Sequence, residues 1–509
     1  MNISQWIERH ADFAPDQVAL HFEGQSLTYA ALAEAIDATA QALKGVLGIG
    51  RGDRVALIST NRPEYVIVLF ACARLGAMLV PLNWRLAIPE LLYILKHAGV
   101  KALLCESDFH DLARVTLDTL PQCQLVGIDF APKGGLEWEA LIQAATGDND
   151  DEQIALDTPL LIVYTSGTTG YPKGAVLTQN ALQWNAMQSI HLHDMTSRDH
   201  ILTPLPMFHV GGLNNQTTPA LYCGATVTLL RRFYPSETLQ AIAGERPRPT
   251  LTCLVPATMQ ACIESPLWAE TDFSDLRIVL TGSTAVPPAL VDAFHQRGTC
   301  VLEMYGATET APIAIYQRPD SDFSKRGSAG LAGLHCQVRV VDAVGNDLPA
   351  GEAGEILLQG PNIMTGYWGD EAATAAALKD GWYYSGDMGY RDAHGYYYIT
   401  DRKKNMIISG GENVYPAEVE RILYGHPGVQ DVAVVGMADE QWGEIPVAVV
   451  IAKADVTLTG EDLDAFVAGQ LARFKRPRQY RFVDELPRNA MGKIQHFKVR
   501  ALCGSPEGP

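Results

Sequence analysis

The sequence predicts an α/β protein with a large N-terminal domain and a small α+β C-terminal domain. From residue 17 to about 400, short β-branched runs alternate with helical patterns, which is typical of largely parallel sheets covered by helices. Between about 325 and 400 the pattern changes to short strands and glycine-rich turns, which indicates a small β-barrel. After residue 403 a separate set of helices and strands begins. We therefore expect domains at 1–403, with two α/β subdomains plus the barrel, and at 404–509.

Individual elements follow from periodicity. The apolar stretch from Tyr65 to Leu82 is interrupted by Arg74 and Gly76, so it predicts a buried helix that runs into a strand and not a membrane span. Pro416 opens a helix with an apolar face. The strands VQDVAVVGM and VAVVIA follow, and a second amphipathic helix is expected to carry Leu463, Phe466, Val467 and Leu471.

Composition excludes several classes of protein. The 509 residues include 39 basic and 58 acidic side chains, a net charge of −19, so no basic excess is available to neutralise nucleic-acid phosphates. Nine scattered cysteines without a C-x-x-C pair favour reduced thiols over disulfides or zinc. The first 17 residues lack the pattern of a signal peptide, and we expect a cytoplasmic protein without a transmembrane segment.

One loop carries the strongest functional signal. The apolar run LLIVY at 160–164 predicts a buried strand, and it is followed by a loop rich in glycine and hydroxyl side chains that ends in Pro-Lys-Gly. Backbone N–H groups near glycines, hydroxyls and a lysine are suited to holding a polyphosphate. The candidate contacts are Thr165, Ser166, Gly167, Thr168, Thr169 and Lys173. Because Lys173 is followed by Gly174, the loop is not a Walker A motif.

The string Y-T-S-G-T-T-G-x-P-K-G closely resembles the signature of the adenylate-forming superfamily, which includes acyl-CoA synthetases, luciferases and adenylation domains. Further matches follow in the order expected for the acyl-CoA synthetase branch. P-L-P-M-F-H, ending at His209, resembles an element whose histidine lines the acyl pocket, although alone it would indicate a core histidine. Gly211 and Gly212 then leave space for an elongated apolar acid.

The next matches concern the nucleotide. Y-G-A-T-E at 305–309 follows a predicted strand, and the resemblance implies that Thr308 binds the α-phosphate and that Glu309 holds Mg²⁺, a cation that prefers oxygen ligands. Tyr305, Gly306 and Ala307 belong to the same nucleotide site, and Gly282 and Ser283 occupy a turn that packs on adenine in the family.

Other matches lie nearer the C-terminus. The resemblance implies that Asp387, in G-W-Y-Y-S-G-D, and Arg402 bind the ribose and that Lys404 is the hinge of a mobile C-terminal domain. In the C-terminal domain, Ser409, Gly410, Gly411 and Glu412 resemble a loop on the CoA side, and Lys493 matches a catalytic lysine that reaches the active site.

These matches predict an AMP-forming acid–CoA ligase that uses Mg²⁺, ATP and coenzyme A, with Lys493, Thr308, Glu309 and His209 as catalytic residues. We expect a medium- or long-chain fatty acid as substrate. The alternatives are an aryl or cinnamoyl acid of the feruloyl or benzoyl type, or an adenylation enzyme that loads a carrier protein. The partners are then a small carboxylic acid, ATP and CoA, and a homodimer is common in such families.

Overall fold

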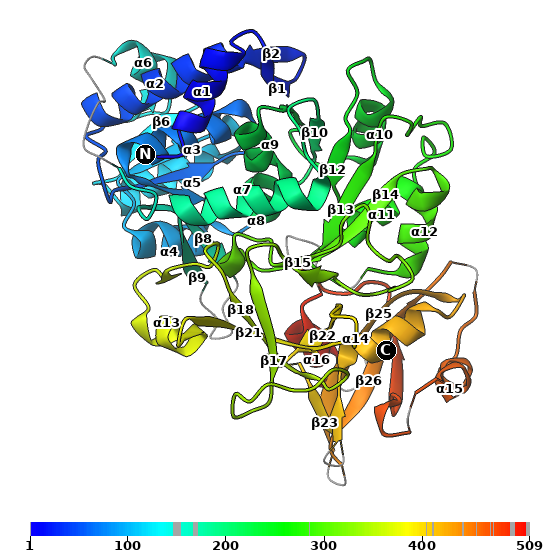
Figure 1. Ribbon diagram of the computed structural model, residues 1–509. Coiled ribbons are helices and arrows are strands. Elements are labelled where there is room, and N and C mark those ends of the chain that lie inside the picture. The colour runs from blue at the N-terminus through cyan, green and yellow to red at the C-terminus, as the bar shows by residue number, and fades with distance from the viewer. Residues whose placement is uncertain are drawn as a thin grey trace.

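The computed structural model describes residues 2–145, 154–165, 172–284, 286–403, 405–409, 412–439, 442–454, 456–468, 470–471, 473–488 and 494–504. Figure 1 shows a large α/β body, coloured blue to green, with a yellow sheet and a smaller orange and red unit beneath it. The predicted α/β class, with a large N-terminal and a small C-terminal domain, is confirmed. The boundary between residues 403 and 404 stays a prediction.

The first α/β layer is an eight-stranded sheet of order β19-β9-β8-β4-β3-β5-β6-β7 in the described chain. Its strands from β8 to β7 are parallel, whereas β9 and β19 are antiparallel. The stretch from Tyr65 to Leu82 forms a buried helix and then strand β4, as predicted. The strands are β3 (Arg54–Ile58), β4 (Met78–Pro81), β5 (Ala102–Cys105), β6 (Gln124–Gly127), β7 (Leu136–Glu137), β8 (Pro159–Thr165), β9 (Lys173–Thr178) and β19 (Gly366–Tyr367).

The second layer is a nine-stranded sheet of order β16-β15-β14-β13-β12-β10-β11-β1-β2 over the same described ranges. Strands β14 to β1 are parallel, and the edges are antiparallel. Its strands are β1 (Val18–Phe22), β2 (Gln25–Thr28), β10 (His200–Thr203), β11 (Thr226–Leu229), β12 (Leu251–Cys253), β13 (Ile278–Gly282), β14 (Cys300–Tyr305), β15 (Ile315–Tyr316) and β16 (Leu331–Ala332).

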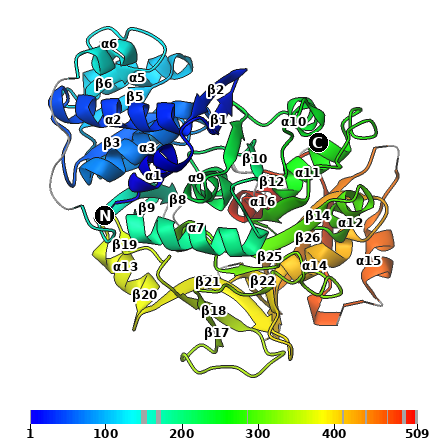
Figure 2. The ribbon, with the colours of Figure 1, turned by 45° about the horizontal axis from the view of Figure 1, so that its top comes forward.

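Helices cover both sheets, and one hydrophobic cluster extends from β3 in the first sheet to β14 in the second. Helix α7 lies against α9 and the π-helical turn η2 (Figures 1 and 2). The helices of the N-terminal region are α1 (Gln5–Phe13), α2 (Tyr29–Gly45), α3 (Pro63–Leu75), α4 (Ile88–Ala98), η1 (Ser107–Phe109), α5 (His110–Thr119), α6 (Trp138–Gln143), α7 (Gln179–His193), α8 (Val210–Gly212), η2 (Leu213–Thr217), α9 (Thr218–Cys223), α10 (Pro235–Ala243), α11 (Pro256–Ile263), α12 (Pro288–Gln296), η3 (Thr308–Thr310) and α13 (Glu371–Ala377).

The region predicted as a barrel is an antiparallel half-barrel of order β17-β18-β21-β20, with β22 also paired to β21. A register shift between Met388 and Gly389 bends β21 beside β22. The strands are β17 (Gln337–Val341), β18 (Gly354–Gln359), β20 (Leu378–Lys379), β21 (Trp382–Arg391) and β22 (Tyr397–Arg402).

The C-terminal unit has its own sheet of order β24-β23-β26-β25, with β27 beside β26. The helix predicted at Pro416 is α14, which buries Val419 and Leu423, and the two predicted strands are β25 and β26. Leu471 was expected on the second helix but follows it, and still packs in the same cluster. The elements are β23 (Ile407–Ser409), β24 (Glu412–Val414), α14 (Pro416–Tyr424), β25 (Val429–Asp439), β26 (Gly443–Ala452), α15 (Gly460–Ala468), η4 (Arg473–Lys475), β27 (Gln479–Phe482) and α16 (His496–Gly504).

The structure also bears on two expectations from composition, which concern the cysteines and membrane-spanning helices. All nine cysteines are free thiols, as predicted. Among the described residues, no helix combines the length and the apolar character that crossing a membrane requires.

Candidate active site

The predicted phosphate loop connects β8 to β9, which pair in antiparallel fashion so that Thr165 lies opposite Lys173. The Thr165 hydroxyl donates to the Lys173 carbonyl oxygen at 3.4 Å. Ser166, Gly167, Thr168 and Thr169 lie outside the described residues, so their part in phosphate binding stays a prediction. The two strands therefore hold both ends of the loop together.

Glu309 lies beyond the end of β14, in the short helix η3, and is 8% exposed. The Tyr367 hydroxyl donates to Glu309 Oε1 at 2.8 Å, and the Met364 N–H donates to the Glu309 carbonyl oxygen at 2.8 Å. The Lys173 ammonium lies 5.3 Å from the centroid of the Tyr367 ring. Tyr367 thus connects the phosphate loop to the predicted magnesium ligand.

Thr308 and Ala307 lie beside Glu309 in the same turn, and Thr308 is buried. Gly306 leaves no room for a side chain, because a Cβ there would overlap the Pro312 carbonyl oxygen. On the neighbouring strand, Gly282 is likewise in close approach to the Met304 backbone. Ser283 follows with a φ of 75°, a left-handed conformation that serine rarely adopts and that is common at functional sites.

The predicted ribose residues form one cluster, in which Asp387 is buried and Arg402 is partly exposed. Asp387 and Arg402 lie opposite each other on β21 and β22, and Arg402 Nε is 2.7 Å from Asp387 Oδ1. The Tyr305 hydroxyl donates to Asp387 Oδ2 at 2.7 Å. Burial, followed by the charge of Asp387, raises the pKa of Tyr305 well above its usual value, so this hydroxyl remains a donor. Both carboxylate oxygens of Asp387 therefore have protein partners.

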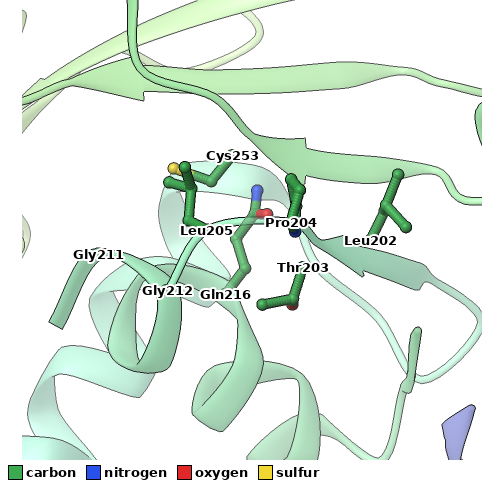
Figure 3. Close-up of a pocket in the computed structure, with 8 residues that line it drawn as sticks. All are labelled: Leu202, Thr203, Pro204, Leu205, Gly211, Gly212, Gln216 and Cys253. Carbon is green, nitrogen blue, oxygen red and sulfur yellow. The ribbon is translucent and has the colours of Figure 1, made fainter. Parts of the chain in front are cut away.

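On the acyl side, His209 precedes α8, and the Gly211 N–H donates to its Nδ1 at 3.0 Å. Gly212 approaches the Pro206 carbonyl oxygen so closely that a Cβ would overlap it. Gly211 and Gly212 line a small hollow of about 10 Å³, which is room for about one water molecule. Figure 3 shows its other lining residues, which are Leu202, Thr203, Pro204, Leu205, Gln216 and Cys253.

Several predicted residues of the C-terminal domain remain untested. Lys404, Gly410, Gly411 and Lys493 lie outside the described residues, and so does the side chain of Glu412. Ser409 is buried at the end of β23, opposite Glu412 in the backbone register. The segment that carries Lys493 is bounded by an isolated antiparallel bridge between Arg488 and Ile494.

The sequence did not single out three residues of this site. Tyr367 and Tyr383 lie on separate strands, and the carboxylate of Glu309 raises the pKa of both hydroxyls, second to burial. Gln216 lines the acyl hollow. A possible signal for Gln216 was the run of five polar residues at 214–218 within a largely apolar stretch, since buried polar side chains need partners.

Comparisons with known proteins identify the family of the chain. The family model described as AMP-binding enzyme matches residues 7–368, and that of the AMP-binding enzyme C-terminal domain matches residues 418–493. An indoleacetate–CoA ligase of Aromatoleum aromaticum is 48% identical over 504 residues, which are 99% of this chain and 98% of that protein. A feruloyl-CoA synthase of an Amycolatopsis species is 39% identical over 502 residues, 99% of each chain.

A solved structure shows the same fold with ligands. The o-succinylbenzoate coenzyme A synthetase of Bacillus subtilis, in complex with ATP and magnesium, aligns with a TM-score of 0.85 and 31% identity over 97% of this chain and 99% of that one. The chain belongs to the AMP-binding enzymes, the adenylate-forming superfamily. Its predicted enzyme class, an AMP-forming acid–CoA ligase, is confirmed at this level.

Enzymes of this class use ATP, Mg²⁺ and CoA, as predicted, and the described residues around Glu309 fit the magnesium ion. Mg²⁺ is usually held in proteins by one or two carboxylates together with substrate phosphates. Glu309 is a buried carboxylate with one oxygen bonded to Tyr367, and the described residues contain no cluster of three or more metal-ligating side chains. The site therefore fits an ion shared with a nucleotide, not one enclosed by protein ligands.

Proposed function

We propose that this enzyme activates an aromatic carboxylic acid and transfers it to CoA, with an arylacetate such as indoleacetate as the first expected substrate. The observation that carries this proposal is the 48% identity to an indoleacetate–CoA ligase over nearly the full length of both chains. The feruloyl and o-succinylbenzoate relatives also act on acids that contain an aromatic ring. The proposal places the aromatic alternative ahead of the fatty acid that the sequence favoured.

The acyl side of the site supports an aromatic acid on physical grounds. The hollow beside Gly211 and Gly212 is small, and the buried amides of Asn215 and Gln216 lie at or beside it. An alkyl tail placed against such amides would leave their polar atoms without partners, which costs free energy. A ring outside the hollow whose polar substituent reaches these amides avoids this cost.

The nucleotide side has groups suited to forming an acyl-adenylate. In this proposal, Lys173 and Thr308 contact the phosphates, and Asp387 with Arg402 binds the ribose. Glu309 holds Mg²⁺, which supplies positive charge where negative charge develops at the α-phosphate. Lys493 stabilises the same charge from the C-terminal domain. Attack of the acid's carboxylate then releases pyrophosphate, and attack of the CoA thiol on the acyl carbonyl releases AMP.

The test is pyrophosphate release with Mg-ATP across a panel of acids, with and without CoA. The panel contains indole-3-acetate, phenylacetate, ferulate, benzoate, octanoate and palmitate. We expect CoA-dependent turnover with kcat/KM highest for an aromatic acid. A preference for octanoate or palmitate would overturn the proposal. If an acyl-adenylate forms but no acyl-CoA appears, a different acceptor, such as a carrier protein, replaces CoA.

A further inference from the structure

The buried amide of Gln216 lines the small hollow beside Gly211 and Gly212, the two glycines predicted to border the acyl pocket. Gln216 belongs to the π-helical turn η2, and π-helical turns are frequent at functional sites. Its side chain is 2% exposed and lines the hollow together with Gly211, Gly212 and Cys253. In Figure 3 this side chain extends from its helix toward Cys253 and Pro204. The amide therefore lies beside a space that a substrate group could enter.

The orientation of this amide is fixed by its partners. Gln216 Nε2 donates to the Thr252 carbonyl oxygen at 3.1 Å and lies 3.0 Å from His193 Nε2. Because a carbonyl oxygen can only accept, the atom that faces Thr252 must be the amide nitrogen. The oxygen and nitrogen of Gln216 are thus distinguished by chemistry and are not interchangeable.

The second amide hydrogen is also used. His193 Nδ1 lies 2.7 Å from the Ser189 carbonyl oxygen, so Nδ1 carries the hydrogen and donates it. Burial lowers the pKa of His193 to about 4, so the ring is neutral at neutral pH and its Nε2 accepts from Gln216. Both hydrogens of the Gln216 amide therefore have acceptors within the protein.

Gln216 Oε1 has no hydrogen-bond partner among the described residues. A buried acceptor without a partner destabilises the folded protein until a donor reaches it. A water molecule would be a poor partner, because a buried water usually needs two to four polar contacts. The hollow offers mainly apolar side chains, including Leu202 and Leu205, and the Thr203 hydroxyl is paired with Thr217. The hollow has room for about one water-sized group, so a single donor group of a larger acid could reach Oε1 there while the ring stays outside it.

We propose that Gln216 Oε1 selects the substrate by accepting a hydrogen bond from an N–H or O–H group on the ring of the acid. This inference rests on the proposed function and narrows it to aromatic acids whose ring carries a donor. Gln216 is then a specificity residue, positioned by Thr252 and by His193 behind it. An acid of the same shape without the donor leaves Oε1 unpaired in the complex and is rejected.

The experiment compares two pairs of acids of matched size. Indole-3-acetate is paired with 1-benzothiophene-3-acetate, in which sulfur replaces the N–H, and 4-hydroxyphenylacetate is paired with 4-fluorophenylacetate. For each pair, the ratio of kcat/KM is measured in the full-length wild-type enzyme and in Gln216→Met. We expect the donor to be preferred by about 10- to 100-fold in at least one pair in the wild type, and by less than about 3-fold in the variant. The pair in which the wild type prefers the donor shows whether Gln216 accepts from an N–H or from an O–H group.

A matched control is available in Gln188→Met. The Oε1 atom of Gln188 is also unpaired among the described residues, but Gln188 does not line the hollow. This variant should keep the wild-type preference even if its activity falls. A ratio measured on one preparation is independent of the fraction of folded enzyme, so loss of stability does not imitate the expected result.

Two results would overturn the inference. One is a wild type that shows no preference for the donor in either pair, and this test requires no variant. The other is a preference that persists in Gln216→Met. In both cases turnover of aromatic acids leaves the proposed function standing, whereas a lack of turnover with every aromatic acid overturns the proposed function itself.

Discussion

The nucleotide side and the acyl side of the site differ in whether their buried polar side chains have hydrogen-bond partners. On the nucleotide side, polar groups bond to one another: Tyr305 and Arg402 occupy the two oxygens of Asp387, and Tyr367 bonds to Glu309. On the acyl side, Asn215 and Gln216 each keep an amide oxygen without a partner among the described residues. The carboxylates of Asp387 and Glu309 are buried, as are the two amides, so burial alone does not explain the difference.

The difference indicates how each side recognises its ligand. Buried charges that are paired are stable before a nucleotide binds. A bound nucleotide must then replace or share the hydrogen bonds that these groups already make. An unpaired amide oxygen is costly until a donor reaches it, so under our proposal it discriminates between acids. We therefore expect substitutions on the nucleotide side to affect all acids alike, and those on the acyl side to depend on the acid.

Glu309→Gln should have the largest effect. Loss of the carboxylate that is proposed to hold Mg²⁺ should lower the rate of pyrophosphate release by about 10²- to 10³-fold with every acid. The measurement is single-turnover adenylation at saturating Mg-ATP. Tyr367→Phe, which removes only the hydrogen bond to Glu309, is the control and should cost about 10-fold or less. A Glu309→Gln enzyme with wild-type rates would contradict the proposed role of Glu309.

Asp387→Asn should weaken nucleotide binding next. Removing this charge leaves Arg402 without its ion-pair partner and weakens the acceptor for the ribose hydroxyls, so KM for ATP should rise by about 10- to 100-fold. KM for the acid should stay within about 3-fold of wild type. Glu355→Gln serves as the control: it removes the charge paired with Lys403 and keeps an oxygen that can accept from the Gly386 N–H, while Asp387 and its two partners stay in place. An equal rise in both KM values would show that Asp387 is not specific to the nucleotide.

Gly211→Ala should have a smaller effect confined to the acid. The added methyl group would lie 3.1 Å from His209 Nδ1, so the histidine side chain must move slightly. We expect KM for the acid to rise by about 3- to 10-fold, since a displacement of this size costs about 1 kcal/mol. Steady-state kinetics with each substrate varied in turn provide the measurement. A change in KM for ATP alone would place Gly211 outside the acyl pocket.

The lowered pKa of His193 predicts that the stability of the protein depends slightly on pH. Burial lowers its pKa to about 4 in the folded protein, below the usual 6.5, so between these values the unfolded chain binds more protons. Stability should therefore fall as the pH decreases from 6.5 toward 4, by at most about 1.4 kcal/mol per pH unit from this group. Thermal unfolding at several pH values should show a shallower decline in Tm for His193→Gln. Parallel curves for the two proteins would refute this assignment.

Sequence patterns predicted the elements with strong local signals. LLIVY became β8, and the helix beginning at Pro416 became α14, because both depend on neighbouring residues in the chain. Tyr305, from the motif at 305–309, contacts Asp387, while the roles of both motifs in nucleotide binding stay predictions. Leu471 was misplaced because helix ends are set by local capping and packing, which apolar spacing does not reveal.

The missed residues share a different feature. Tyr367 and Glu309 are separated by 58 positions, and Gln216 and the Thr252 carbonyl by 36. Such pairs depend on the positions of β19 and β12 in their sheets. The spacing of apolar residues along the sequence does not reveal these positions. The unpaired oxygen of Gln216 was equally invisible, because it requires the positions of all its neighbours.

The path of the chain between the two large sheets has a consequence for biosynthesis. Strand β1 pairs with β11, and the Thr226 hydroxyl donates to the Val18 carbonyl oxygen across 208 positions. The strands β3 to β7, which lie between them in sequence, belong to the other sheet. At a translation rate of about 5–20 residues per second, β1 must wait roughly 10 to 40 s for its partner. During that time its edge is exposed on the ribosome, where a chaperone could cover it.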